Sequence, residues 1–325
     1  MKYISNKSFA WLSCFLLVAC QPEEVTTTGS GNTLQVASVN LENEGNTRAA
    51  VTSIEEVMVY ATNDKQAAIA ANSQSRFTFD GSSWSCPTPP ELTDGATFNI
   101  YAWYPSQKDG NDKDIAVTNN TDGNHYIPVQ VESEDSFTDQ KQKDYLYADQ
   151  TSGQITASTI SKSVRFKMKH ALSKVSFEIT KDISAKEALT LTRVDIISGT
   201  NSLQTGTNGQ MYLKNGTLNN LSAKGQISLT GSLNLTTSLS APNISALVAP
   251  MMQPEKVLSF RLPVSVNGEK RIFETGTVST INGVLWKAGQ HNVYQIKVSK
   301  IGGTIKGVAV YDWKKDSDQN TQVGI

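Results

Sequence analysis

Val164-Arg-Phe-Lys-Met-Lys-His170 places apolar side chains at every second position and cationic side chains between them. The stretch that follows, Leu172–Ile179, is also rich in alternating apolar residues. A period of two is typical of a β-strand with one buried face, because successive side chains of a strand point to opposite faces. The middle of the chain is therefore predicted to form β-strands.

The same pattern extends in both directions, and Gly, Asn and Asp turn residues separate its segments. On the N-terminal side the predicted strands are 54–60, 77–79, 98–104 and 126–131, the last restricted to an edge or a bulge by Pro128. On the C-terminal side they are 189–196, 211–213, 227–229, 245–249, 257–266, 270–274, 293–298 and 306–313. Asn267-Gly268 between two of these is a strong hairpin signal. Segments 133–143 and 181–188 are candidates for a short helical turn.

This pattern predicts an all-β protein with two tandem β-sandwich domains, 49–162 and 163–325. The length of 325 residues fits two domains, each large enough to bury a core. With 29 Lys and Arg against 30 Asp and Glu, the formal net charge is -1, which excludes a strongly basic nucleic-acid binder and a polybasic membrane-surface protein. Charged residues make up only 18% of the chain, too few for intrinsic disorder throughout.

The N-terminus is predicted to be an export signal, residues 1–19. Lys2 and Lys7 precede an apolar run, Phe9–Ala19, which is too short to span a bilayer. The run ends Leu-Val-Ala-Cys20, which resembles a bacterial lipobox, so lipid attachment at Cys20 is expected. An ordinary signal peptide that happens to contain a cysteine is the alternative.

Residues 20–48 are predicted to be a flexible tether, because few large apolar residues offset the entropy of ordering it. Arg48 lies between this tether and the first strong strand, where extended chain could enter an Arg-specific protease and be cut before Ala49. A single solvated arginine in a linker is the simpler interpretation of the spacing alone.

The sequence holds no local motif for catalysis. His125, His170 and His291 are far apart, and there is no HExxH, CxxC, nucleophile elbow or phosphate-binding loop. Asp109-Gly-Asn-Asp-Lys-Asp114 is oxygen-rich but lacks EF-hand order, so a solvated turn is favoured over calcium. With Cys14 in the signal and Cys20 lipidated, Cys86 has no partner for an intrachain disulfide and is expected to be structural. We expect no enzyme activity, no metal and no cofactor.

Four aromatic residues, Trp84, Tyr101, Trp103 and Tyr104, could form a platform for sugar stacking. Alternation instead places 101 and 103 on one face of a strand and 104 on the other, so core packing is favoured.

Several segments in order resemble a known family. They are the lipobox, Thr47-Arg48-Ala49, Tyr145–Ala148, Phe166–Val175, Trp286–Val298 and Val310–Trp313. Together they resemble the fimbrillin-like proteins of Bacteroides and related bacteria, the subunits of type V pili, over essentially the whole chain. The resemblance implies two Greek-key, transthyretin-like sandwiches in a lipoprotein of the outer membrane, acylated, for example with palmitate, at Cys20.

The resemblance also implies a mechanism. An Arg-specific protease cuts after Arg48, removal of the first strand region opens a hydrophobic groove, and a strand of the next pilus subunit fills it, with adhesion to a host or bacterial surface ligand as the outcome. The candidate donor strand carries Ile305, Val308, Val310 and Trp313. The tail beyond it, Lys314–Gln322, is polar, so either the last strand exchanges or the tail is inert, as in an anchor or tip protein.

Two other functions stay open at this stage. One is a monomeric surface lipoprotein that binds a glycan or a host ligand. The other is a hydrolase, which would require the fold to assemble a site around one of the distant histidines.

Overall fold

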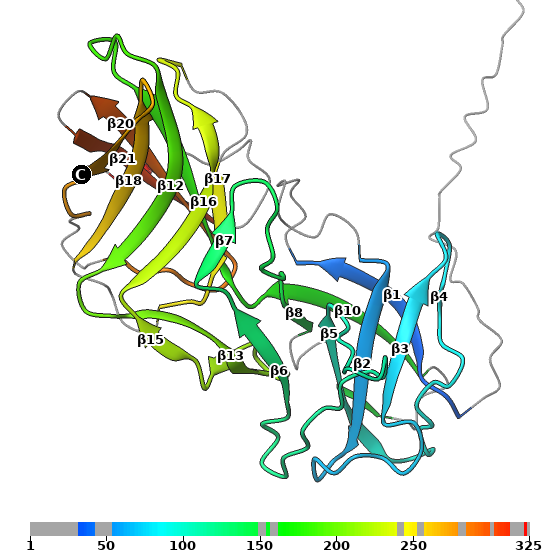
Figure 1. Ribbon diagram of the computed structural model, residues 1–325. Coiled ribbons are helices and arrows are strands. Elements are labelled where there is room, and N and C mark those ends of the chain that lie inside the picture. Colours follow the sequence, from blue (N-terminus) through cyan, green and yellow to red (C-terminus); the bar gives the residue numbers. More distant parts are fainter. Residues whose placement is uncertain are drawn as a thin grey trace, which may run out of the picture. The chain divides into compact units, whose positions relative to one another are not determined.

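The computed structural model describes residues 32–42, 54–148, 154–156, 162–238, 244–251, 257–278, 284–299, 302–312 and 322–323. All regular elements in these ranges are β-strands, so the predicted all-β class is confirmed (Figure 1). None of the described segments is a helix of the length and hydropathy needed to cross a bilayer.

The two predicted helical turns are wrong. Within 133–143 the chain forms a short strand, β7 (Glu134–Ser136), which pairs in parallel with a strand of the C-terminal half. Within 181–188 the Asp182 carboxylate accepts the Ser184 amide at 2.9 Å and its carbonyl accepts the Ala185 amide at 3.0 Å. Asp side chains favour such local bonds over helix continuation.

The first sheet has eight strands. Its order is β1 (Gln35–Leu41), β10 (Ser163–His170), β8 (Leu146–Ala148), β5 (Thr97–Tyr104), β2 (Glu56–Asn63), β3 (Gln74–Phe79) and β4 (Trp84–Ser85), with β9 (Gln154–Thr156) paired to β5. Six consecutive residues are buried in both β2 and β5. Alternate side chains of these strands therefore enter two different cores, one on each face of the sheet.

Val57, Val59, Ile100 and Ala102 belong to a first core that Phe166 also joins, here called the N-terminal core. On the other face, Met58, Tyr60, Tyr101 and Trp103 belong to a second core, which residues from both halves of the chain complete: Ile127, Val129, Val131, Tyr145, Ala171, Leu172, Met211, Leu213, Leu247 and Ala249.

Two five-stranded sheets enclose a third core. One has the order β17 (Ile244–Val248), β11 (Ser173–Lys181), β20 (Gln290–Ser299), β21 (Gly302–Asp312) and β22 (Gln322–Val323). The other has the order β19 (Glu269–Glu274), β18 (Leu258–Val266), β12 (Leu189–Ser198), β16 (Gln226–Asn234) and β7; β18, β12 and β16 run side by side in Figure 1. Alternate residues of both sheets, among them Phe177, Phe260 and Tyr294, meet in this sandwich core.

A small fourth sheet joins segments that are distant in sequence. Its strands are β14 (Leu218–Asn219), β13 (Leu203–Tyr212), β15 (Ser222–Lys224) and β6 (Tyr126–Val131), which pairs with β13. Among the described strands β13 is the only partner of β6, so Pro128 does occupy an edge strand, as predicted.

Strand pairing crosses the predicted domain boundary in both directions. β10 begins at Ser163 but lies in the sheet of the N-terminal half, whereas β6 and β7 pair with strands of the C-terminal half. The division at 162/163 stays a prediction, and the described cores do not separate along it.

The expected hairpin at Asn267-Gly268 joins β18 and β19. Both residues have positive φ, 51° and 92°, as the tight turn of a twisted hairpin requires.

Part of the predicted tether is a strand. Residues 35–41 form β1, which pairs with β10, whereas the composition around them indicated flexible chain. Its apolar residues are Leu34, Val36, Val39 and Leu41, and a bulge after Val36 interrupts the period of two. That interruption, within a polar stretch, hid the strand from the alternation test.

Tyr294 and Trp286 form a buried polar contact in the sandwich core. Both side chains are fully buried, and the indole Nε1–H donates to the Tyr294 hydroxyl at 2.9 Å. Burial raises the pKa of Tyr294 above its usual value, so this hydroxyl stays protonated.

We expect Tyr294→Phe to lower the free energy of unfolding by about 1–3 kcal/mol, because it leaves a buried indole N–H without an acceptor. Urea unfolding followed by tryptophan fluorescence measures the change. Tyr212→Phe is the matched control: its hydroxyl accepts an exposed bond from Asn219 at 3.1 Å, which water can replace. Equal effects of the two substitutions would contradict this account.

Candidate functional site: the first strand and the edge of β10

The predicted site residues divide into two groups. Cys20, Arg48, Ala49 and Trp313 lie outside the residues whose structure is described. Ile305, Val308 and Val310 lie in β21, where Ile305 and Val308 pack against the sandwich core. The structure adds a segment that the sequence interpretation missed, the strand β1 just upstream of Arg48.

β1 is an edge strand that pairs in parallel with β10, from Gln35 beside Ser163 to Leu41 beside Met168. Among the described strands, β1 is the only partner of β10 over Ser163–Lys167, because β8 pairs only with Met168–His170. Without β1, this part of β10 would present unpaired backbone N–H and C=O groups.

The apolar face of β1 closes the N-terminal core. Leu34 and Val36 are 1% and 5% exposed, and Val39 and Leu41 are partly buried against the same core. Their neighbours on β10 are Val164, Phe166 and Met168, which are at most 2% exposed. The removal of β1 would therefore open an apolar groove along β10.

Polar contacts fix the beginning of β1. The Lys162 ammonium lies 2.7 Å from Asn32 Oδ1 and 2.7 Å from Asp94 Oδ1, and donates to the Leu92 carbonyl at 2.9 Å. The Leu34 amide donates to the Pro90 carbonyl at 2.8 Å, and the Leu92 amide donates to the Asn32 carbonyl. β1 also lies near β4, at the other end of the strand order.

At its far end β1 is held by β10 again. The Glu42 amide donates to the Met168 carbonyl at 2.8 Å, and the Glu42 carboxylate lies 3.3 Å from the Lys169 ammonium. All contacts described for β1 are non-covalent. A cut at Arg48 would separate the strand from the chain that follows, and among the described residues only these contacts would then retain it.

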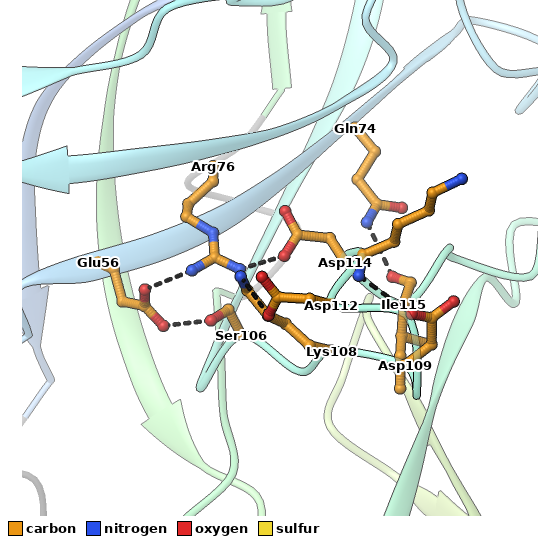
Figure 2. A network of polar contacts seen from close by, with 10 residues as sticks. Glu56, Gln74, Arg76, Ser106, Lys108, Asp109, Asp112, Asp114 and Ile115 are labelled. Carbon is orange, nitrogen blue, oxygen red and sulfur yellow. Dashed lines mark hydrogen bonds and ion pairs between the residues drawn. The ribbon is translucent and has the colours of Figure 1, made fainter.

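The loop after β5 has its own polar network, drawn in Figure 2. Arg76 lies 3.0 Å from Glu56 and also pairs with Asp114, while Gln74 Nε2 donates to the Ile115 carbonyl at 2.8 Å. These contacts attach the loop to β2 and β3.

The acidic loop considered for calcium is part of this network. Asp109 accepts the amides of Asn111 and Lys113 at 2.8 and 3.0 Å, and Asp112 pairs with Lys108 at 2.8 Å. These contacts lower the pKa of both carboxyls. No group of three or more potential metal ligands of the His, Cys, Asp and Glu types occurs among the described residues. The acidic side chains thus shape the loop.

The three histidines lie in separate surroundings. His125 is buried beside Tyr60 and Tyr101, and its Nε2 lies 3.1 Å from Gln66 Oε1. His170 Nδ1 is 3.0 Å from the Asp144 carboxylate, and His291 Nε2 is 2.7 Å from Ser176 Oγ.

The Ser176–His291 pair has the composition of a nucleophile and a base. Both residues are at most 5% exposed, and burial lowers the pKa of His291 to about 3. A substrate cannot reach a pair this deeply buried, and a base with such a pKa is weak at neutral pH.

The remaining candidate residues, the aromatic residues and Cys86, pack in or against the cores. Tyr101 and Trp103 are at most 2% exposed, so they pack in the core, as expected. Trp84 is partly buried against the N-terminal core and lies beside Phe79. Cys86 is a free thiol whose pKa is raised by burial, which makes it a poor nucleophile.

Comparison with known proteins adds an independent finding. The sequence profile described as fimbrillin-like matches residues 47–313. A comparison with curated proteins finds no match.

Solved structures share the fold. A fimbrial protein from Bacteroides vulgatus aligns with a TM-score of 0.61 at 14% identity, over 87% of this chain and 99% of its own. A candidate cell adhesion protein from Bacteroides uniformis aligns with a TM-score of 0.57 at 20% identity, over 87% and 98%. Another candidate cell adhesion protein, from Bacteroides ovatus, gives 0.56 at 18% identity, over 88% and 99%.

We expect Lys162→Met to loosen the beginning of β1, because the Leu92 carbonyl and the Asn32 and Asp94 side chains lose their shared cation. Hydrogen exchange followed by mass spectrometry would then show faster exchange of the Leu34 and Leu92 amides. Lys167→Met is the control, since Lys167 lies exposed on the outer face of β10, the strand that begins just after Lys162. Exchange of both variants at the wild-type rate would show that Lys162 does not hold the beginning of β1.

Proposed function

Because the chain belongs to the fimbrillin-like family, we propose that it is a structural or accessory subunit of a cell-surface pilus that assembles by strand exchange and supports adhesion. The observation that carries this proposal is β1. It completes a sheet and a core, it is held only by non-covalent contacts among those described, and it precedes the candidate cleavage site Arg48.

The first stage of the proposal is export to the outer membrane. The apolar run Phe9–Ala19 directs secretion, and the Cys20 thiol receives lipid. More than one acyl chain on Cys20 gives stable anchoring, because one chain alone holds a protein only marginally.

The second stage is cleavage after Arg48. β1 then dissociates, and the groove along β10 is left with Val164, Phe166 and Met168 exposed. The burial of Leu34 and Val36 contributes about 3–6 kcal/mol, at about 1.5–3 kcal/mol for each fully buried aliphatic side chain. A strand from another subunit that fills the groove recovers this energy and the backbone hydrogen bonds.

The candidate donor is β21, with Ile305, Val308 and Val310. Of residues 302–310 in this strand only Ala309 is buried, and Ile305 and Val308 are partly buried against the core, so β21 contributes less to its own core than the central strands do. Its outer neighbour, β22, pairs with it only at Val308 and Ala309. Each subunit would donate its strand to the next in a head-to-tail contact. Such contacts give a filament when the rotation between neighbouring subunits does not close a ring.

The proposed subunit performs no catalysis. Each histidine has a structural environment, and the Ser176–His291 pair is closed to substrate. Its partners are other pilus subunits, an Arg-specific protease and a surface ligand. A monomeric lipoprotein that binds a glycan or host ligand is the competing function, and polymerisation separates the two.

Treatment of the wild-type protein with an Arg-specific protease should produce ladders that resist SDS without boiling. Arg48→Ala should abolish both the cut and the ladders, because β1 then stays attached. Arg271→Ala, a substitution of an exposed arginine on β19, should leave both unchanged. A protein that is cut at Arg48 and stays monomeric would support the competing ligand-binding function.

Cys20→Ser should move the protein from the membrane fraction to the soluble fraction and remove metabolic labelling with palmitate. Cys86→Ser is the control and should leave both unchanged. Mass spectrometry of the N-terminus of cell-associated protein reports acylated Cys20, free Ala49 or both. Labelling that persists in Cys20→Ser would show that the lipid lies elsewhere.

A further inference from the structure

We infer that Arg165 is a second cleavage site for an Arg-specific protease, and that β1 protects it until the protein has been cut at Arg48. A subunit whose β10 edge stays empty is then cut within β10, whereas a subunit whose edge is paired is spared. This inference rests on the cleavage proposed above and adds a control on the groove that it opens.

The arginines of the chain have an uneven placement. Arg48 is followed by five more, and each of these lies in a β-strand: Arg76 in β3, Arg165 in β10, Arg193 in β12, Arg261 in β18 and Arg271 in β19. A paired strand is a poor protease substrate, because its backbone groups already have partners and it must detach from the sheet before it is cut. Strand pairing therefore shields the folded chain from an Arg-specific protease.

Arg165 differs from the other four in the strand that supplies its pairing. It lies beside Ser38 of β1, and among the described strands β10 has no other partner over residues 163–167. The other four arginines are paired by β2, β16, β12, β19 and β18, and none of them by β1. Loss of β1 therefore unpairs the backbone at Arg165 and at no other of the five.

The side chain of Arg165 is also available to a protease. It is exposed on the outer face of β10 and has no ion pair within the described ranges. Each of the other four is paired with a carboxylate: Arg76 with Glu56 and Asp114, Arg193 with Asp195, Arg261 with Glu274 and Arg271 with Glu269. A guanidinium without such a partner is free to enter an acidic recognition pocket.

Without β1, this part of β10 meets the other requirement of a protease substrate. Extended peptides bind through backbone hydrogen bonds of the kind that add a strand to a sheet edge. Over residues 163–167 the backbone of β10 would offer such groups unpaired. Val164 and Phe166 would also lose their apolar neighbours on β1, so local detachment of the segment becomes easier.

The proposed reaction is hydrolysis of the peptide bond between Arg165 and Phe166. Water adds across the C–N bond, which leaves a carboxylate on Arg165, an amine on Phe166 and the fragments 49–165 and 166–325. The cut divides β10 within the segment that β1 had covered, so no strand can afterwards pair along it. Empty grooves are thus destroyed, and filled grooves persist because their occupant pairs with β10 as β1 did.

The order of the two cuts is the first test. Full-length wild-type protein is digested with an Arg-specific protease and followed by intact-mass spectrometry, and we expect the cut at Arg48 before the cut at Arg165. Arg48→Ala should slow the second cut at least about ten-fold, because β1 stays attached. Arg165→Lys keeps the charge and should be cut only at Arg48, at the wild-type rate. Equally rapid cleavage at Arg165 in Arg48→Ala would overturn the inference.

A second arm opens the edge of β10 without any cut at Arg48. In the Arg48→Ala chain, Val36→Asp places a carboxylate against the N-terminal core and should displace β1, so that Arg165 is cut at least about ten-fold faster. Asn40→Asp in the same chain is the control, because Asn40 is exposed. Arg76, in the same sheet, should stay uncut. Equal rates at Arg165 in the two variants would overturn the inference.

A third arm restores the pairing and does not depend on the folding of a variant. Wild-type protein is digested in the presence of a peptide copy of residues 32–42, which contains no arginine. The peptide should slow the cut at Arg165 at least about ten-fold, because it pairs with β10 again. A scrambled peptide of the same composition should have no effect. Equal rates with the two peptides would overturn the inference.

The two proposals fail separately. If native mass spectrometry shows that protein cut at Arg48 keeps β1 and forms no ladder, strand exchange fails, and faster cleavage of the Val36→Asp chain still supports the protection of Arg165. If ladders form but Arg165 is cut equally fast with and without β1, the protection of Arg165 fails and strand exchange stands.

Discussion

The backbone ladder between β1 and β10 is the contact on which the N-terminal half depends. It supplies hydrogen bonds to an otherwise open sheet edge and brings Leu34 and Val36 into the core. Sheet completion and core closure are thus performed by one short strand. Because that strand lies ahead of Arg48, the proposed cleavage there would remove its covalent link to the chain that follows. On the proposed mechanism, stability before cleavage and reactivity after it would have the same physical origin.

The rest of the molecule provides a scaffold that does not need β1. β2 and β5 are buried on both faces, and the core on the side away from β1 contains residues from both halves of the chain. β6 and β7 pair with β13 and β16, so backbone hydrogen bonds join the two halves. The sandwich core around Trp286 and Tyr294 lies farther along the chain and is complete without β1. Loss of β1 would therefore leave these two cores with all their described residues.

Much of this fold follows from local sequence. Strict alternation located β10 to within a few residues, and Asn267-Gly268 fixed a hairpin, because period and turn chemistry are local properties. Pro128 was correctly restricted to an edge. The pairing of β6 and β7 with distant strands could not be predicted, because alternation says which face is buried and nothing about the neighbouring strand. β1 was missed because its few apolar residues lie in a polar stretch and a bulge after Val36 interrupts their period. A search for two offset alternations would have found it.

The parallel pairing of β1 has a consequence for the order of folding. Most of the N-terminal half lies between Gln35 and its partner Ser163, so β1 cannot pair until that segment has been synthesised. Contacts this remote in sequence carry a large loop-closure entropy and tend to form late. The hairpin of β2 and β3 and its neighbour β5 are close in sequence and can condense first. The nascent chain thus passes through a form in which the edge of β10 is unpaired. Removal of β1 by proteolysis would recreate that unpaired edge in the folded protein.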